Sequence, residues 1–589
     1  MKKIRNFCLL LLLPLCFAAC PADERESNSN TVNFISLEAN GDDITVTTVL
    51  TLAFDKDIIG LTAADIAFDG GSTGASKGPL NKTGIGAFRL GISGITSNGN
   101  VSVTVTKSGY DITNGTRSVF AYYPKNWDVT FVANGGTPAP GDQAVTHNAA
   151  ASRPVNPVKQ GQLFFAWYTD AAFTDQWNFS TDTVTSDVTL YARYVGQDQL
   201  PSAQDYFNEK NLAVGWNIGN SLDAGGWSSD GPNETAWGNP VINQAIMNGV
   251  KEAGFNLIRI PVTWRRAIGP APDYAIDARM LRRVAEVVGY AEKAGLTAII
   301  NLHHDGQVPP SSGETSWLLM RQARESQEEY DRITDQFSKV WTQIAEHFKD
   351  YGLSLIFESF NELHDGNWGW FNEQQAIDRN EALQFEIINS WNQVFTDVVR
   401  DSGGINSFRY LIVSGLCQRP HQTIKDSFIM PDDPVPGRQI LSIHYYDPES
   451  FSLRGSSATW KDLTVPVPEQ IPAEEGIAFT FAEFKEKFVN RNIPVIIGEA
   501  GPILARSSAT IWPGGTVVEI DTELAHQNRL SYIAYMYGTA KANGIVPVYW
   551  DNGKFDRGGD GFGLFDRNTG LPGSDESDAC IKAMIDAVK

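Results

Sequence analysis

The spacing of apolar residues changes near residue 205, and this change divides the chain into two kinds of region. Beyond it, continuous apolar runs alternate with amphipathic segments such as residues 277–293 and 331–348. Continuous apolar runs indicate parallel strands buried on both faces, and amphipathic segments indicate the helices that cover them. The alternation predicts a (β/α)8 TIM barrel over residues 205–589. Its eight predicted strands are Val214–Gly219, Leu257–Val262, Thr297–His303, Leu355–Asn361, Tyr410–Gly415, Ile440–Tyr446, Val495–Ala500 and Val546–Asn552.

Residues 32–123 show a different pattern, in which apolar and polar positions alternate in short runs. Ile44–Leu50 and Val101–Val105 are examples, and clusters of Gly, Asn and Ser separate such runs. Many short strands at this spacing predict a small β-sandwich. In pattern, the region resembles the Ig-like modules of bacterial surface proteins.

Residues 124–196 form a second small all-β region, and a linker over residues 197–204 joins it to the barrel. Its phrases, among them residues 129–138, resemble the internalin-type B repeat, a β-grasp-like unit of bacterial surfaces. Trp167 and Trp177 are candidates for a sugar-binding platform. Because so small a module needs aromatic bulk to fold, we expect both in its core. The resemblance implies a role in spacing or adhesion.

The first twenty residues read as a targeting segment, with basic residues followed by an apolar run over residues 8–17 that is too short to span a bilayer. The run ends in Ala-Ala-Cys, which resembles a bacterial lipobox with Cys20 as the acylated residue. The alternative is an ordinary signal peptide cut near Ala19. Polar residues 21–31 form a tether. We therefore expect an exported lipoprotein at the cell surface or outer membrane, on either face, held to the membrane through a lipid on Cys20.

Composition narrows the possible ligands. Hydrophobic residues make up 42% of the 589 residues, as in folded globular proteins. The net charge of −22 argues against nucleic acid, whose phosphates would be repelled, and fits a neutral substrate. Apart from Cys20, the mature chain keeps only Cys417 and Cys580, which we expect to be buried free thiols, with a bridge as the alternative. We expect a monomer.

Polar, ionisable and aromatic residues gather where the predicted barrel strands end. In TIM barrels the active site lies at the C-terminal ends of the strands. A chain that needed only the fold would not place such groups at most of its strand ends. In chain order, these candidates are Asn220, Arg259, His303, His304, Asn361, Glu362, His444, Tyr446, Glu499, Trp550 and Asn552.

These residues, at these strand positions, resemble glycoside hydrolase family 5, over roughly 205 to 589. The phrases over residues 215–223, 234–240 and 550–553 are similar to subfamily 4, the endo-β-1,4-glucanases and xyloglucanases. The resemblance implies that Glu362 is the acid/base and Glu499 the nucleophile. It also implies retaining hydrolysis of cellulose-type, mixed-linkage or xyloglucan chains, for which the two carboxyl groups lie about 5–5.5 Å apart.

The same resemblance assigns supporting roles around the two glutamates. Arg259 is expected near Glu499, where it keeps the carboxylate ionised, and Tyr446 is expected to donate to the same group. His444 is placed to exchange protons with Glu362. Such neighbours separate the pKa values of two carboxyl groups that have different tasks.

Other rim residues are expected to bind the sugar. Asn361 should donate to the sugar 2-hydroxyl. His303 is the better candidate for a hydroxyl contact, and His304 for a supporting hydrogen bond. Trp550 should form the apolar floor, and the Trp550–Asp551 peptide is expected to be cis, as in this clan. Tryptophans that could stack on sugar rings elsewhere are Trp227, Trp237, Trp317, Trp368 and Trp370.

Three alternatives remain beside the leading hypothesis. A zinc site over residues 303–305 is possible, but the glutamate pair accounts for the same residues without a metal, so we expect no cofactor. A β-mannanase would use the same machinery. A catalytically inactive, carbohydrate-binding surface adhesin would use the β modules with a degenerate barrel, and the intact pair Glu362 and Glu499 speaks against it.

Overall fold

The computed structural model describes residues 30–589 except 161, 180–181, 197–198, 307–315, 366–367, 369–372, 468 and 512–515. The predicted targeting segment, Cys20 and most of the tether therefore lie outside the described residues. The chain divides into two compact units. One runs up to Trp127 and takes in residues 144–149 and 184–186, and the other contains the rest of the chain.

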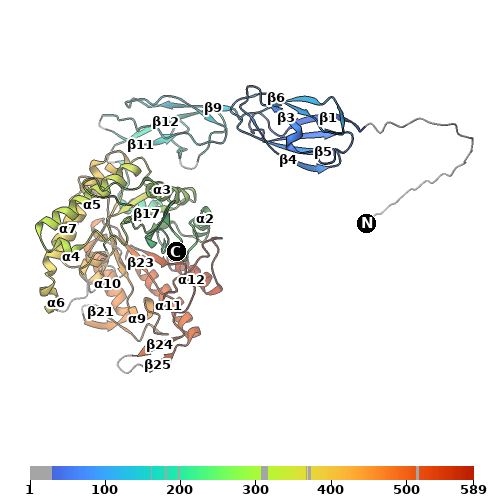
Figure 1. Ribbon diagram of the computed structural model, residues 1–589. Coiled ribbons are helices and arrows are strands. Elements are labelled where there is room, and N and C mark those ends of the chain that lie inside the picture. The colour runs from blue at the N-terminus through green and yellow to red at the C-terminus, as the bar shows by residue number, and fades with distance from the viewer. Residues whose placement is uncertain are drawn as a thin grey trace, which may run out of the picture. The chain divides into compact units, whose positions relative to one another are not determined.

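The first module is a β-sandwich (Figure 1). Its core contains buried residues that alternate with more accessible ones along the strand, such as Leu50, Leu52 and Phe54. The five-stranded sheet β4-β5-β2-β1-β7 contains β1 (Thr31–Ala39), β2 (Val49–Phe54), β4 (Ser76–Gly84), β5 (Ala87–Ser93) and β7 (Asp111–Thr113). The three-stranded sheet β3-β6-β8 contains β3 (Ile66–Asp69), β6 (Gly99–Val105) and β8 (Thr116–Ala121).

The second module is a four-stranded sheet in which the outer elements of the sequence pair in parallel. Trp167 and Trp177 are buried, and Phe131 packs edge-on against Trp167 with ring centroids 5.1 Å apart. Both tryptophans therefore belong to the core, as expected. The order β10-β9-β12-β11 comprises β9 (Asn126–Val132), β10 (Gln143–Thr146), β11 (Leu163–Tyr168) and β12 (Val188–Val195).

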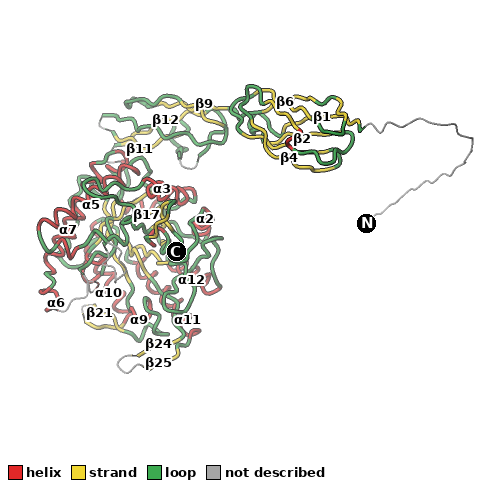
Figure 2. The backbone as a smooth tube through the Cα atoms, in the orientation of Figure 1, coloured by secondary structure: helices red, strands yellow, loops and turns green. Residues whose placement is uncertain are grey.

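The third part is a closed barrel of eight parallel strands, which confirms the predicted fold class. The strands are drawn yellow in Figure 2. Every barrel strand overlaps one predicted from an apolar run, because these strands are buried on both faces. In barrel order they are β13 (Gly215–Ile218), β16 (Leu257–Ile260), β17 (Thr297–Asn301), β18 (Leu355–Glu358), β19 (Leu411–Ser414), β20 (Gln439–Tyr445), β23 (Val495–Ala500) and β26 (Ile545–Asp551).

Helices surround the barrel, and their starts follow local chemistry. The side chain of Asp277 caps α3 by accepting a hydrogen bond from the amide of Arg279, and Val284, Val288 and Ala291 form its buried face. The longer helices are α2 (Gln244–Glu252), α3 (Ala278–Lys293), α5 (Gln327–Phe348), α7 (Glu381–Asp401), α10 (Ala473–Lys487), α11 (Thr522–Ala542) and α12 (Asp575–Ala587).

The same region also contains short helices and two-stranded sheets. The short helices are α1 (Ala203–Glu209), α4 (Met320–Ala323), α6 (Glu373–Asp378), α8 (Pro420–Thr423) and α9 (Glu449–Ser452). The two-stranded sheets are β14 (Gly226–Ser228) with β15 (Gly231–Asn233), β21 (Thr464–Val467) with β22 (Glu469–Pro472), and β24 (Ser508–Ile511) with β25 (Thr516–Glu519). Within the described residues, no helix has the length and hydrophobicity that crossing a membrane requires.

Several strands end earlier than their apolar runs predict. β18 ends at Glu358, not Asn361, and β17 ends at Asn301, not His303. The residues that follow these two strands belong to loops at the rim of the barrel. Glu362, in one of these loops, adopts a left-handed backbone with φ of 48°. Glu362 therefore lies in the loop after β18, whereas Glu499 lies within β23.

Arg409 lies just before β19, at the end of the barrel opposite the rim where the candidate site residues lie. Its buried guanidinium donates to the carbonyls of Phe348 and Tyr351 at 2.9 and 2.8 Å, and to those of Gly352 and Leu355 at 3.0 and 2.6 Å. One side chain thus ties the end of α5 to the start of β18.

Replacing Arg409 with Met should destabilise the barrel strongly, because four carbonyls would each lose a hydrogen bond, and those of Phe348 and Gly352 would keep only a backbone donor. At about 1–3 kcal/mol for each buried unsatisfied group, we expect the barrel Tm to fall by at least about 5 °C in scanning calorimetry. Arg491→Met, at an exposed arginine, is the matched control and should leave the Tm nearly unchanged. Equal shifts in the two variants would contradict this role.

Candidate active site

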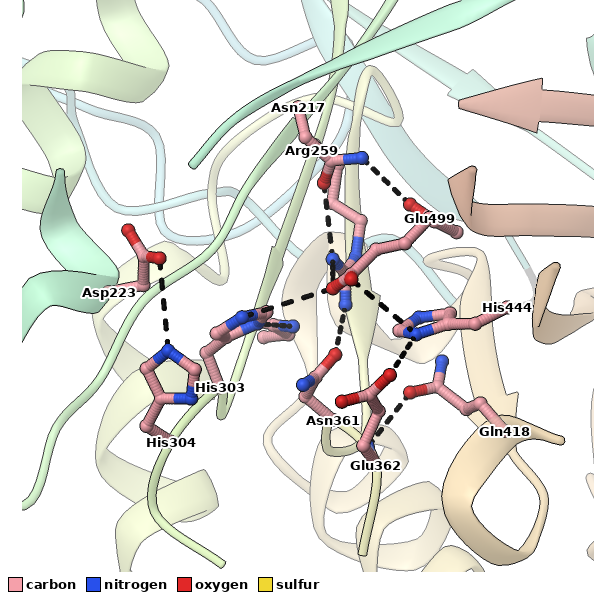
Figure 3. A network of polar contacts seen from close by, with 12 residues as sticks. Asn217, Asp223, Arg259, His303, His304, Asn361, Glu362, Gln418, His444 and Glu499 are labelled. Carbon is pink, nitrogen blue, oxygen red and sulfur yellow. Dashed lines mark hydrogen bonds and ion pairs between the residues drawn. The ribbon is translucent and has the colours of Figure 1, made fainter. Parts of the chain in front are cut away.

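The candidate site is organised around Arg259 of β16 (Figure 3). The guanidinium is fully buried, and its Nη1 donates to Glu499 Oε1 at 2.9 Å and to Asn217 Oδ1 at 3.1 Å. Its Nε donates to Glu358 Oε2 at 2.7 Å, and its Nη2 donates to Asn361 Oδ1 at 2.8 Å. A single cation therefore fixes side chains from β13, β18, β23 and the loop after β18.

Glu499 lies near the end of β23 and receives two hydrogen bonds from the protein. Besides Arg259, the hydroxyl of Tyr446 donates to Oε2 at 3.2 Å. Burial raises the pKa of Tyr446 well above its usual range, so this hydroxyl keeps its proton. Both predicted contacts of Glu499 are thus present, and the two imidazoles of His303 and His444 lie 3.9 and 3.7 Å from the carboxylate.

Glu362 faces Glu499 from the loop after β18. Its Oε1 lies 2.7 Å from His444 Nδ1, and its amide donates to Gln418 Oε1 at 2.9 Å. One carboxylate oxygen of Glu362 and one of Glu499 lie within 4.8 Å of each other. The structure therefore brings the two predicted catalytic glutamates together, with His444 between them.

The environments of the two carboxyl groups differ. Burial raises the pKa of Glu499 above its ordinary value; the charge of Glu362 adds to this, while His444 and Arg259 oppose it. Burial would also raise the pKa of Glu362, but the hydrogen bond and charge of His444 outweigh it and lower the pKa. The expected effect of Arg259, which is to favour the ionised form of Glu499, is present but is smaller than the opposing effect of burial. Because Arg259 and Tyr446 both donate to Glu499, the transferable proton belongs to the pair of Glu362 and His444.

His303 and His304 occupy different environments. The ring of His303 stacks parallel on Trp550, with centroids 5.6 Å apart and planes within 4°. Burial holds the pKa of His303 well below its usual range, so the imidazole is neutral and can hydrogen-bond a hydroxyl. His304 Nε2 lies 3.9 Å from Asp223 Oδ2, and its ring packs near Trp237.

The peptide bond between Trp550 and Asp551 is not cis, which corrects the expectation from the family resemblance. The cis bonds found among the described residues all precede proline, so this peptide is trans. β26 continues in register with β13 through both residues, Trp550 opposite Asn217 and Asp551 opposite Ile218, and a trans peptide maintains that pairing. Trp550 still lines the cleft beside His303.

Asn552 and Asn220 shape loops at the rim. Asn552 donates to the carbonyl of Asp560 at 2.7 Å and accepts from the amides of Lys554 and Phe562, so both ends of its amide organise the loop after β26. Asn220 adopts a left-handed backbone, and its backbone amide donates to the carboxylate of Asp223. In this structure both residues support the rim.

A cleft of about 490 Å³ opens above the two glutamates. Trp368 lines it and is 47% exposed, so its face is accessible to a ligand. Trp237 is also exposed, whereas Trp317 is buried and donates to Asp305, and Trp227 packs partly buried on the barrel core. Trp370 lies outside the described residues.

Several residues of the site had not been predicted. Glu358 had a signal, since it is a charged residue inside an apolar run, whereas Gln418 had none. Two sets of side chains in the described part of the chain have the donors for a metal ion, Asp223 with His303 and His304, and Glu362 with His444 and Glu499. The second set is the candidate catalytic pair together with His444. Cys417 and Cys580 are buried free thiols, as expected.

One end of the Asn361 side-chain amide is fixed by Arg259 and the other end remains available as a donor. Its Oδ1 accepts from Arg259, which fixes the amide so that Nδ2 points the other way as a donor. No acceptor for Nδ2 is found among the described residues. This donor lies beside the glutamate pair (Figure 3).

Comparison with known proteins agrees with this geometry. The model of the cellulase family, glycosyl hydrolase family 5, matches residues 223–556, more than half of the chain. The model of the Listeria-Bacteroides repeat domain matches residues 127–193, the second module.

Individual relatives cover the barrel. Endoglucanase A of Paenibacillus barcinonensis is 36% identical over 60% of this chain and 84% of its own length. A xyloglucan-specific endo-β-1,4-glucanase of Bacteroides ovatus is 33% identical over 63% and 68%. The solved structure of a GH5-4 broad specificity endoglucanase from Bacteroides salanitronis is 36% identical, with a TM-score of 0.55 over 64% of this chain and 93% of that one. The chain belongs to glycoside hydrolase family 5 and is an endo-β-1,4-glucanase-type hydrolase.

Proposed function

We propose that this protein cleaves β-1,4-glucosidic bonds within glucan chains with retention of configuration, through a covalent intermediate on Glu499. The observation that carries the proposal is the approach of Glu362 and Glu499 to within 4.8 Å. Retaining enzymes hold their two carboxyl groups about 5–5.5 Å apart, whereas inverting enzymes leave about 6.5–9.5 Å for a water molecule. The close approach supports direct attack by a carboxylate.

The contacts around each glutamate support its role. Glu499, held by Arg259 and Tyr446, attacks the anomeric carbon, and Glu362 delivers to the leaving oxygen the proton that it shares with His444. Glu362 then takes a proton from the water that hydrolyses the glycosyl-enzyme. The Nδ2 group of Asn361 is placed to donate to the sugar 2-hydroxyl, and Trp550 forms an apolar floor.

The substrate class follows from the relatives. The similar proteins are named as endoglucanases, a xyloglucan-specific glucanase and a broad specificity endoglucanase. We infer that cellulose-type, mixed-linkage and xyloglucan chains are all candidates for this protein. Trp368, exposed at the cleft, offers a face on which a glucosyl ring stacks.

We also propose that the enzyme is an exported, monomeric lipoprotein, anchored through Cys20 at the cell surface or outer membrane. The support is the apolar run that ends in Ala-Ala-Cys. Metabolic labelling with a palmitate analogue tests the anchor. Label on the wild type and none on Cys20→Ser is expected, and unlabelled wild type would refute the anchor.

Replacing Glu499 with Gln should abolish hydrolysis while leaving the fold intact, because the amide has nearly the same shape but cannot act as the nucleophile. We expect reducing-end release from carboxymethylcellulose and xyloglucan to fall by at least about 10³-fold. The matched control is Glu519→Gln, at an exposed glutamate of β25, which should retain full activity.

Galactomannan is the third substrate in that assay. Wild-type activity chiefly on galactomannan would replace the glucan with a mannan as substrate. A wild-type chain inactive on all three polysaccharides would refute the enzymatic proposal and favour a surface adhesin. ¹H NMR of the first product formed should show the β-anomer, and an initial α-anomer would exclude retention.

Replacing Tyr446 with Phe should move the acidic limb of kcat/KM to higher pH. The lost hydroxyl donates to the Glu499 carboxylate, so its removal disfavours the charged form and raises the pKa of Glu499 further. Activity needs this carboxylate, and it should therefore disappear at a pH about 0.5–1 unit higher as the pH falls. Tyr445→Phe, at the neighbouring tyrosine that packs on Phe481, is the control. An unmoved limb in Tyr446→Phe would contradict this role.

A further inference from the structure

A third carboxylate, that of Glu358, shares the Arg259 guanidinium with Glu499. Glu358 is the last residue of β18 and is fully buried. Its Oε2 accepts from Arg259 Nε at 2.7 Å and from Asn301 Nδ2 at 3.0 Å, and its Oε1 accepts from Gln418 Nε2 at 3.0 Å. A buried charge is retained only where its partners compensate it, so the identity of these partners indicates its role.

Each partner of Glu358 in the described chain contacts a residue of the active site. Arg259 donates to the nucleophile Glu499, and Asn301 Nδ2 lies 3.3 Å from His303 Nδ1. Gln418 accepts from the amide of Glu362. The three contacts therefore lead to the nucleophile, the sugar-facing histidine and the acid/base.

The contact through Gln418 acts on the acid/base. Glu362, Cys417 and Gln418 all have left-handed backbones, with φ of 48°, 53° and 49°. Residues other than glycine adopt this conformation only where surrounding contacts impose it. The side chain of Gln418 is one such contact, because it joins the amide of Glu362 to the Glu358 carboxylate.

The contact through Arg259 acts on the charge of the nucleophile. The guanidinium lies between two carboxylates, Glu358 and Glu499, with hydrogen bonds of 2.7 and 2.9 Å. Glu358 therefore balances part of the positive charge that Glu499 would otherwise meet alone. A carboxylate paired with an uncompensated buried guanidinium would be held more tightly and would be a weaker nucleophile.

We propose that Glu358 is a positioning residue for both catalytic glutamates, acting on Glu499 through Arg259 and on Glu362 through Gln418. The proposal rests on the retaining mechanism proposed above. It differs from a purely structural ion pair, because the two contacts should affect separable steps of the reaction.

Two substrates can distinguish the effect of the Gln418 contact from that of the Arg259 contact. A glucan needs a proton on its leaving oxygen, whereas 2,4-dinitrophenyl β-cellobioside releases a phenolate that departs without one. For both, kcat/KM reports the formation of the glycosyl-enzyme. Changes at Gln418 should therefore slow the glucan selectively, and changes at Glu358 should slow both substrates.

The first variant is Gln418→Met, which retains length but removes the bridge. We expect kcat/KM on carboxymethylcellulose to fall by on the order of 10²-fold, as for a misplaced catalytic group, and kcat/KM on the aryl cellobioside to fall far less. Gln384→Met, at a buried glutamine on α7 outside the site, is the matched control and should leave both values unchanged. An equal fall on both substrates would overturn the Gln418 contact.

The second variant is Glu358→Gln, which keeps the shape and removes the charge. An amide offers one acceptor and one donor, so it cannot accept from Arg259 and from Gln418 at once. Both substrates should be slowed. With the guanidinium left to Glu499 alone, the charged form of Glu499 is favoured, and the acidic limb of kcat/KM should move to lower pH. An unmoved limb would overturn the Arg259 contact.

The double variant Glu358→Gln with Gln418→Glu tests the connection itself. It exchanges carboxylate and amide, so that residue 358 again accepts from Arg259 and donates to residue 418, which again accepts from the Glu362 amide. We expect at least tenfold recovery of kcat/KM on carboxymethylcellulose over Glu358→Gln. No recovery in a double variant whose Tm equals that of Glu358→Gln would overturn the proposal.

Failure of the proposed function gives a different result. A wild type inactive on both substrates would refute the proposed glucanase activity. Crystal structures of the full-length variants would then show the positions of the Arg259 and Glu362 side chains directly. Displacement of the Arg259 and Glu362 side chains in Glu358→Gln, reversed in the double variant, supports the positioning role. Unmoved side chains would overturn it.

Discussion

A buried guanidinium is the interaction on which the site depends. Taking Arg259 out of water is costly, and the surrounding barrel stabilises it with two carboxylates and two amide oxygens. Those four acceptors come from three strands and one loop. The geometry of the site therefore depends on the closure of the barrel, and the orientation of each acceptor depends on the same cation.

The chemistry of the site follows from where protons can reside. Glu499 accepts hydrogen bonds from a guanidinium and a phenol, whereas Glu362 lies against the imidazole of His444. The two carboxyl groups thus differ in partner more than in burial. This difference in partners supports the different roles proposed for them.

Much of the barrel was predictable because its strands are buried on both faces, so that each appears as an apolar run. The points where the strands end were less predictable. The run through Leu355–Asn361 continues past the end of β18, because Ser359 and Phe360 are buried without being in a strand. Apolar patterning records burial, and it does not record where the hydrogen-bonded ladder stops.

The candidate site was predictable where residues resemble a family motif, as for Glu362 and Glu499, and much less so elsewhere. Gln418 lies in a turn with left-handed backbone angles, in the loop after β19. This turn brings the Gln418 side chain to the backbone amide of Glu362, in the loop after β18. Nothing in the local sequence marks such a turn, since it depends on contacts between distant segments. The expected cis peptide at Trp550 was wrong for a similar reason: the pairing of β26 with β13 keeps it extended.

The barrel closes between its first strand and its last, since β13 pairs with β26. On its other side β26 pairs with β23, so it is the strand that separates β13 from β23. Asn217 of β13 and Glu499 of β23 both accept from Nη1 of Arg259. The two acceptors are therefore held around one nitrogen only when β26 has paired on both of its edges, which makes the assembly of the site a readout of complete barrel closure.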